Sequence, residues 1–551
     1  MLKRTISIAI VCILVLSLIP AFAAEADFIV ENGTLTKYTG IDAYVKIPAG
    51  VTAIGAGVFS GNSFIESLSV PGSVKTIGGS AFKDCERLKK VTIDYGFLTT
   101  IGASAFENCK RLTDINIPDT TRTIEVSAFQ GTRSLKTITF PKGLVTIGNS
   151  AFQESALELV TIPETVTSVG LNAFSGDIYL TAITAAAENT AYTTYDGVLY
   201  SKWATRLVQY PAGRAGPYVI PNGVTTISDG AFWGSVALTS ITIPNSVTEI
   251  GSSAFWDCKL ITAITLPDSV TKLGGRAFGN SPALYSVSIP GSVQDIEYET
   301  FLNCKSLTNV ILAEGVKTIG TAAFKGCTAL SVITVPSSVI FFDSQVFDAA
   351  TLKKINGIKG SATESYAALT RLTFADANLA PDWAAVALQQ INASGLIPPQ
   401  LQSLYTAYAT RAEFAALVVP LLERKLGTID ITGITASDTT DANILKCKAV
   451  GVMSGNGAFM NPNGIMTRST AAGFIANTAR ALGFEDKTAD LSIFSDSANI
   501  ADWAKPGVEF VVGWKLMVGD GQTFNPNTIY MRISCIIAFK GLSDLYTSTL
   551  Q

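Results

Sequence analysis

A single phenylalanine recurs along this chain at a nearly constant spacing, and that period limits the possible folds more than any other feature. The spacings are 23, 24, 23, 23 and 22 residues in a first series and 23 throughout a second series. The positions are Phe59, Phe82, Phe106, Phe129, Phe152 and Phe174, then Phe232, Phe255, Phe278, Phe301, Phe324 and Phe347. Twelve copies at one period predict a repeat architecture in which each copy forms one structural unit.

Each copy follows the pattern Leu-x-x-Ile-x-Ile-Pro-x-x-Val-x-x-Ile-Gly-x-x-Ala-Phe, as between Leu238 and Phe255. The first part predicts a short strand whose alternate residues point inward. The proline ends this strand because it has no N–H to donate to a neighbouring strand. We expect the Val and Ile to pack beneath the strand and the Ala-Phe pair to close the coil. One coil cannot bury its apolar face alone, so the copies are predicted to stack as a solenoid.

Five cysteines occupy one register, three residues after the repeat phenylalanine: Cys85, Cys109, Cys258, Cys304 and Cys327. Most other copies have a small residue there, which predicts a small buried side chain. Buried free thiols are the favoured interpretation. Disulfides between stacked coils, such as Cys304 with Cys327, are the alternative, because coils stack at about the separation that a disulfide spans.

Over roughly residues 40–350 the repeat resembles the BspA-like leucine-rich repeats of bacterial surface antigens. The resemblance implies an α/β-type, right-handed solenoid with short parallel strands, found in cell-surface adhesins and interaction proteins. It implies no particular ligand, because the shared motif is structural.

Residues 1–23 are predicted to be an export signal. Lys3 and Arg4 precede an apolar run that ends at the small-residue site Ala21-Phe22-Ala23, a typical cleavage pattern. No later segment approaches the roughly 18 apolar residues that a membrane span needs. We therefore expect a secreted chain at the cell surface or cell wall, without a transmembrane span after signal removal. The solenoid and its N-terminal cap are predicted to cover residues 24–355.

The repeat is interrupted between Phe174 and Phe232, where Asp196-Gly197 predicts a hairpin within an insertion near residues 186–220. Trp233 and Trp256 follow, at a repeat position that is mostly polar in other copies and is therefore predicted to be exposed. These aromatic residues form a candidate ligand patch for sugar or protein contacts: Tyr192, Tyr195, Tyr200, Trp203, Trp233 and Trp256. In the alternative interpretation both tryptophans pack beneath the inserted hairpin.

Beyond residue 355 the period stops, and a linker is predicted over residues 356–370. Three helical segments follow, at residues 371–430, 431–485 and 486–551. Thr410-Arg411-Ala412-Glu413 in the first is a capping box. Arg411 would then occupy the first helical position, where unpaired N–H groups favour an anion and a guanidinium can bind a carboxylate with two hydrogen bonds.

The three segments resemble S-layer homology (SLH) motifs. This resemblance implies a mainly α, threefold domain that binds secondary cell-wall polysaccharide, often pyruvylated, without a covalent bond. The residues carried over by position are Asp376, Trp383, Arg411, Arg468, Asp496, Trp503 and Arg532. The second segment lacks the Phe-x-Asp and Trp-Ala elements and has Thr470 where Glu is usual. The third has Met531 in place of the capping Thr and Ser534 in place of Glu.

The chain contains no histidine, which excludes Ser-His-Asp and Cys-His catalysis and every histidine-ligated metal site. Its 40 basic and 44 acidic residues give a net charge of -4 without long runs of one sign, so no nucleic-acid partner is expected. The sequence predicts a non-enzymatic adhesin or interaction protein without cofactor or metal. It would be anchored to cell-wall polysaccharide and bind an extracellular protein or glycan on its repeats. The alternatives are a structural surface-layer component and a carboxylate-dependent glycan-active enzyme.

Overall fold

The computed structural model describes residues 25–348, 350–379, 384–393, 395–402, 405, 407–455, 460–519, 522–528 and 530–549. The predicted export signal and Trp383 lie outside these residues. The chain divides into two compact units, the first made of Met1–Gly216, Thr226–Leu238 and Gly251–Lys259, the second of Pro217–Thr225, Thr239–Ile250 and Leu260–Gln551. None of the described helices combines the length and apolar character needed to cross a membrane.

In the first unit most coils contribute strands to two sets of parallel strands. The Leu-x-x-Ile-x-Ile part forms a four-stranded sheet of β3 (Tyr44–Lys46), β5 (Ser67–Val70), β7 (Lys90–Ile93) and β9 (Asp114–Ile115). In later coils the same part forms a separate two-stranded sheet of β12 (Leu159–Ile162) and β14 (Ala182–Ala185). The second sheet contains two-residue strands: β4 (Ala53–Ile54), β6 (Thr76–Ile77), β8 (Thr100–Ile101), β10 (Thr123–Ile124), β11 (Thr146–Ile147) and β13 (Ser168–Val169). The repeat Ile expected beneath the first strand therefore belongs to a strand of its own, and its side chain points into the core.

Antiparallel strands begin the second sheet and also begin a separate six-stranded sheet of the same kind. A short 3-10 helix, η1 (Glu25–Asp27), precedes the first hairpin, β1 (Phe28–Glu31) with β2 (Thr34–Tyr38), which pairs in parallel with β4. The insertion supplies β15 (Tyr192–Tyr195), β16 (Val198–Ser201) and β17 (Arg206–Gln209), which joins β19 (Thr226–Ile227). Asp196 and Gly197 both have positive φ, 50° and 73°, as a two-residue hairpin turn requires.

The repeat phenylalanines form a ladder of stacked, fully buried rings. From Phe59 to Phe174 successive ring centroids lie 4.8 to 5.7 Å apart. Tyr210 from the insertion is also fully buried and stacks on Phe232 at 4.8 Å. In the second unit the ladder continues from Phe278 to Phe347 with separations of 5.2 to 5.6 Å. Each stacked pair contributes about 0.5–1.5 kcal/mol beyond the burial of its area.

The repeat cysteines are free thiols in this structure. All seven cysteines of the described residues are buried and unbridged. Cys85 Sγ donates to the carbonyl oxygen of Phe59 at 3.0 Å, and Cys304 Sγ donates to that of Phe278 at 3.2 Å. Burial raises the pKa of both thiols to about 12. The register therefore holds a small, protonated side chain that donates a hydrogen bond to the preceding coil.

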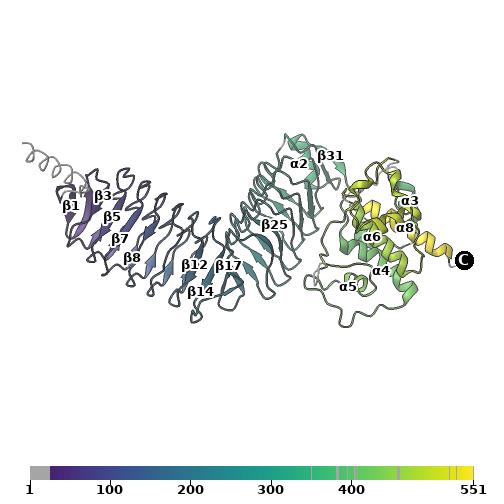
Figure 1. Cartoon of the computed structure of the whole chain (residues 1–551). Helices are drawn as coiled ribbons and strands as arrows, with labels where there is room; N and C mark the ends of the chain where they lie inside the picture. The colour runs from purple at the N-terminus through teal and green to yellow at the C-terminus, as the bar shows by residue number, and fades with distance from the viewer. Residues whose placement is uncertain are drawn as a thin grey trace, which may run out of the picture. The chain divides into compact units, whose positions relative to one another are not determined.

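The second unit begins with further coils of the same design. Their longer strands are β18 (Gly216–Val219) with β20 (Leu238–Thr242), then β22 (Ala263–Thr265), β24 (Ser286–Ile289) and β26 (Asn309–Leu312), and β28 (Val332–Thr334) with β30 (Lys354–Gly357). Their two-residue strands are β21 (Glu249–Ile250) with β23 (Lys272–Leu273), and β25 (Asp295–Ile296), β27 (Thr318–Ile319) and β29 (Phe341–Phe342). Figure 1 shows the strands of successive coils lying side by side in each unit.

The solenoid ends later than predicted. The expected linker, residues 356–370, instead contains the end of β30 and helix α2 (Ala362–Thr370), and β31 (Thr373–Asp376) then pairs in parallel with β30. Tyr366 of α2 stacks on Phe342 at 4.4 Å and meets Phe347 edge-on. The helix covers the last rings because a terminal coil would otherwise expose its apolar face.

The remaining part of the second unit is helical and has its own apolar core. Its helices are α3 (Ala385–Ala393), α4 (Arg411–Leu426), α5 (Ala442–Ala449), α6 (Arg468–Ala481), α7 (Lys505–Gly513) and α8 (Arg532–Thr549), with short 3-10 helices η3 (Pro399–Leu401), η4 (Leu491–Ile493) and η5 (Ser497–Asn499). Arg411, Arg468 and Arg532 are each the first residue of a helix. These three helices are labelled α4, α6 and α8 in Figure 1.

Candidate functional site

A closed ring of three backbone hydrogen bonds joins the three helical segments. The residue two positions before each arginine takes part. Ala409 N–H donates to Tyr530 at 2.8 Å, Tyr530 to Met466 at 2.8 Å, and Met466 to Ala409 at 3.2 Å. The three segments are thus arranged in a cycle around one point.

Each arginine helix also begins against the loop of the next segment. The N–H of Arg411 donates to Gly464, that of Arg468 to Thr528 and that of Arg532 to Ala407, at 3.1, 2.9 and 2.7 Å. The first helix therefore meets the second loop, the second meets the third, and the third meets the first. Sequence reasoning grouped each arginine with residues of its own segment, whereas the structure forms each site between two segments.

At the Arg468 site a guanidinium and a carboxylate both bind the loop that contains Phe524. Arg468 Nε donates to the carbonyl oxygen of Phe524 at 2.7 Å, Nη2 donates to that of Val518 at 2.9 Å, and the guanidinium lies over the Phe524 ring. The Asp496 carboxylate accepts the N–H groups of Phe524 and Asn525 at 2.8 and 2.7 Å. The two predicted residues, Arg468 and Asp496, therefore lie at one site.

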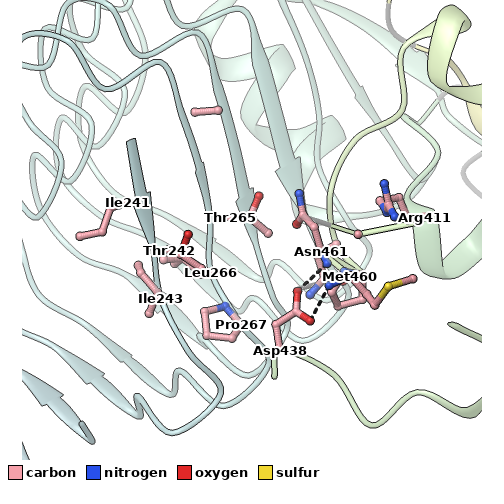
Figure 2. Close-up of a pocket in the computed structure, with 14 residues that line it drawn as sticks. Ile241, Thr242, Ile243, Thr265, Leu266, Pro267, Arg411, Asp438, Met460 and Asn461 are labelled. Carbon is pink, nitrogen blue, oxygen red and sulfur yellow. Dashed lines mark hydrogen bonds between the residues drawn. The ribbon is translucent and has the colours of Figure 1, made fainter. Parts of the chain in front are cut away.

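Arg411 has the same kind of surroundings, and Figure 2 draws it together with Asp438, Met460 and Asn461. Its guanidinium lies 4.8 Å from the Phe474 ring centroid, and Nη2 donates to the carbonyl oxygen of Ser454 at 2.6 Å. Burial lowers the pKa of Arg411, and the negative charge of Asp438 opposes this effect. The group remains a cation because the ordinary pKa of arginine exceeds about 12. Its Nε is buried without a hydrogen-bond partner among the described residues.

Asp438 is a site residue that sequence reasoning missed. Its carboxylate accepts the N–H groups of Met460, at 2.8 Å, and Asn461, as Asp496 does those of Phe524 and Asn525. Asn461 and Asn525 both have positive φ, 51° and 56°, and a buried proline follows each. The signal in the sequence was the Ser-Asp pair that Ser437-Asp438 shares with Ser495-Asp496.

The third arginine is already neutralised. Arg532 Nη2 forms an ion pair with Glu413 Oε1, and the two side chains are 12% and 19% exposed. Glu413 Oε2 also accepts the N–H of Thr410 at 3.0 Å, and Glu413 N–H donates to Thr410 Oγ1 at 3.2 Å. The predicted capping box is present, and its carboxylate binds the arginine of another segment.

The other predicted residues of this region lie elsewhere. Asp376 belongs to strand β31 of the solenoid, where its carboxylate accepts the N–H of Asn378 at 3.1 Å. Trp503 is 68% exposed, and no hydrogen bond or ring contact joins it to the three arginines within the described residues. Trp383 lies outside the described residues. Two sites of matching design therefore emerge, one at Arg411 with Asp438 and one at Arg468 with Asp496.

The structure separates the six residues of the aromatic patch. Tyr200 is fully buried, and Tyr192 is half-buried with its hydroxyl oxygen accepting the N–H of Val169 at 2.7 Å. Tyr195 and Trp203 are 65% and 86% exposed on the inserted hairpin. Trp233 and Trp256 are half-buried, and the described structure contains no ring contact between them. They were expected to be exposed, but neighbouring coils meet at this position, where Gly176 N–H donates to the carbonyl oxygen of Trp233 and Gly234 N–H to that of Trp256, both at 2.9 Å.

The fold defines the class of this chain: a parallel-strand solenoid of the leucine-rich repeat kind. Residues 99–195 and 219–363 match six copies of the family described as BspA type Leucine rich repeat region. The chain is therefore a leucine-rich repeat protein with repeats of the BspA type. No curated protein matches it.

Several solved structures are similar to this chain. A leucine rich cell surface protein from Faecalibacterium prausnitzii is 30% identical, and the match covers 64% of this chain and 98% of that chain with a TM-score of 0.49. A leucine-rich repeat protein from Eubacterium ventriosum is 27% identical over 57% and 87%, with a TM-score of 0.43. The pneumococcal vaccine antigen PcpA is 22% identical over 60% and 87%, with a TM-score of 0.41.

Proposed function

We propose that this chain is a non-catalytic interaction protein of the bacterial cell surface, held to anionic cell-wall polysaccharide by Arg411 and Arg468. In this proposal the solenoid presents the ligand-binding surface, and the helical part of the chain acts as an SLH-type anchor. The observation that carries the proposal is the repetition of one arrangement at two sites. At each site a guanidinium at a helix N-terminus accompanies a carboxylate-bound loop with an exposed Asn.

The chemistry of these two sites favours an acidic group on the polysaccharide. A guanidinium at a helix start adds its donors to the positive end of the helix dipole. In both sites the nearby carboxylate is occupied by backbone N–H groups, so it orients the loop and leaves the guanidinium to the ligand. At Arg411 the Nε hydrogen has no acceptor among the described residues, and a carboxylate of a pyruvyl group would supply one.

The third arginine is excluded from the anchor in this proposal. Glu413 already provides the carboxylate that a ligand would otherwise offer to Arg532. An acidic polysaccharide would have to displace an ion pair that is mostly shielded from water. The sites at Arg411 and Arg468 therefore hold the chain to the wall, and each contributes separately to the affinity.

Sedimentation with cell walls tests this proposal. The full mature chain is mixed with peptidoglycan sacculi that carry their secondary polysaccharide, and with sacculi from which hydrofluoric acid has removed it. Because a hydrogen bond to a charged group is worth about 1.5–3 kcal/mol, Arg411→Gln and Arg468→Gln should each weaken binding about tenfold or more. The double variant should remain in the supernatant.

The matched control is Arg424→Gln, which removes an exposed arginine from the last turn of the same helix as Arg411. This variant should sediment like the unchanged chain. Undiminished sedimentation of the double variant, or equal binding to stripped sacculi, would contradict the anchor.

A further inference from the structure

A surface groove lies in the first unit, away from the hairpin tyrosines. It has a volume of about 430 Å³, within the range of about 300–1,000 Å³ that is typical of small-molecule sites. Its aromatic lining is Trp233 together with Tyr179, which is 58% exposed. Trp233 belonged to the predicted patch, whereas Tyr179 did not.

Two stacked glycines form the hollow of this groove. Gly176 and Gly234 line it, both with a φ of 74°. A Cβ added to Gly234 would lie 2.7 Å from Gly176 Cα. The N–H of Gly176 donates to the carbonyl oxygen of Trp233 at 2.9 Å, so the backbones of two coils meet there. With no side chains at this point, the surface dips between the two aromatic residues.

The charged residues that line the groove are all in ion pairs. Arg133 Nη2 lies 2.6 Å from Glu154 Oε2, and Asp257 pairs with Lys259. Each ion pair is neutral as a whole, although Lys259 does not itself line the groove. An ionic ligand would therefore gain no net attraction there, whereas the paired polar groups still offer hydrogen bonds to hydroxyl groups.

The floor of the groove is held by a buried polar pair. Ser155 lines the groove, and its Oγ lies 2.8 Å from both carboxyl oxygens of Asp177, which is fully buried. Because these two groups are bonded to each other below the surface, the groove keeps its shape without a ligand. A preformed site avoids the entropy cost of ordering on binding.

From these observations we infer that this groove binds a neutral, pyranose-based glycan. One flat face of a pyranose ring carries C–H groups that pack against an aromatic ring such as Trp233, and its hydroxyl groups match the paired Arg133, Glu154 and Asp257. The inference rests on the proposed function only in taking the solenoid as the ligand-presenting part. It differs in ligand class from the helical sites, which are built for an acidic group.

A glycan array with the full chain tests this inference. The probes are immobilised neutral oligosaccharides, together with sialylated and sulfated forms of the same sugars. The unchanged chain should bind neutral members, and Tyr179→Ala should lower the affinity for them about tenfold or more. Tyr95→Ala, which removes an exposed tyrosine that does not line the groove, is the matched control and should bind like the unchanged chain.

Trp233→Ala should abolish binding, but this residue is half-buried, so Tyr179→Ala decides the question if the tryptophan variant does not fold. Equal effects of Tyr179→Ala and Tyr95→Ala, binding of acidic members alone, or no glycan binding by the unchanged chain would overturn the inference. The Arg411→Gln, Arg468→Gln double variant should bind the neutral glycan normally. Failure of the wall anchor and failure of the groove are thereby distinguished.

Discussion

Asp177 allows a sharp test of the packing described for the coils. It occupies the small-residue register, three positions after Phe174, and both of its carboxyl oxygens lie 2.8 Å from Ser155 Oγ. Burial raises the pKa of this carboxyl well above its ordinary value of 3.8, and the charge of Glu154 raises it further. The folded chain therefore keeps a proton that the unfolded chain releases.

The bound proton makes the folded chain less stable as the pH rises. Below pH 3.8 both states hold the proton, and Asp177 does not oppose folding. As the pH rises further, only the unfolded state ionises, so the free energy of unfolding falls by up to about 1.4 kcal/mol per pH unit. The fall ends when the pH reaches the pKa of the folded state.

Asp177→Asn removes this ionisation and keeps a neutral group of the same shape beside Ser155. Its stability relative to the unchanged chain should therefore increase as the pH rises above 4, and the difference should level off at the pKa of the folded state. Urea denaturation followed by circular dichroism at pH 4, 5 and 6 measures the difference. Asp114→Asn, at an exposed strand position, is the control and should keep the pH profile of the unchanged chain. Parallel profiles for Asp177→Asn and the unchanged chain would contradict the raised pKa of Asp177 in the folded chain.

Two further predictions concern the core. Phe129→Ala should lower the free energy of unfolding by about 3–5 kcal/mol, because its fully buried ring stacks on Phe106 and Phe152 at 5.2 and 5.1 Å. Phe64→Ala, at a residue 45% exposed, should change it by less than about 0.5 kcal/mol. Thermal unfolding of both variants checks the pair, and equal losses would contradict the ladder. Iodoacetamide should alkylate Cys304 and Cys327 only after unfolding, since burial raises the pKa of Cys304 to about 12. Mass spectrometry of a disulfide-linked peptide that joins them would contradict the free thiols.

At the helical sites, features that depend on neighbouring residues in the sequence could be predicted, whereas features that depend on distant residues could not. Arg411 and Arg468 were found because a helix start is a local signal, carried by Thr410-Arg411 and Thr467-Arg468. Asp438 was missed because its role depends on a loop more than 20 residues later, whose N–H groups it accepts. Glu413 was expected to cap its own helix, and it does. Its ion pair with Arg532, 119 residues away, is beyond any local pattern.

The coil could be predicted from the repeat alone, because each repeat makes most of its contacts with neighbours of the same pattern. The period, the buried phenylalanines and the small buried register were all legible from it. Three features became apparent only in the folded chain. The repeat Ile forms a second set of strands, Thr373–Asp376 adds a strand to the solenoid, and Tyr200 is buried while Tyr195 is exposed. Each of these outcomes depends on which segments become neighbours after folding, and a strand of two to four residues has too little local preference to choose its partner.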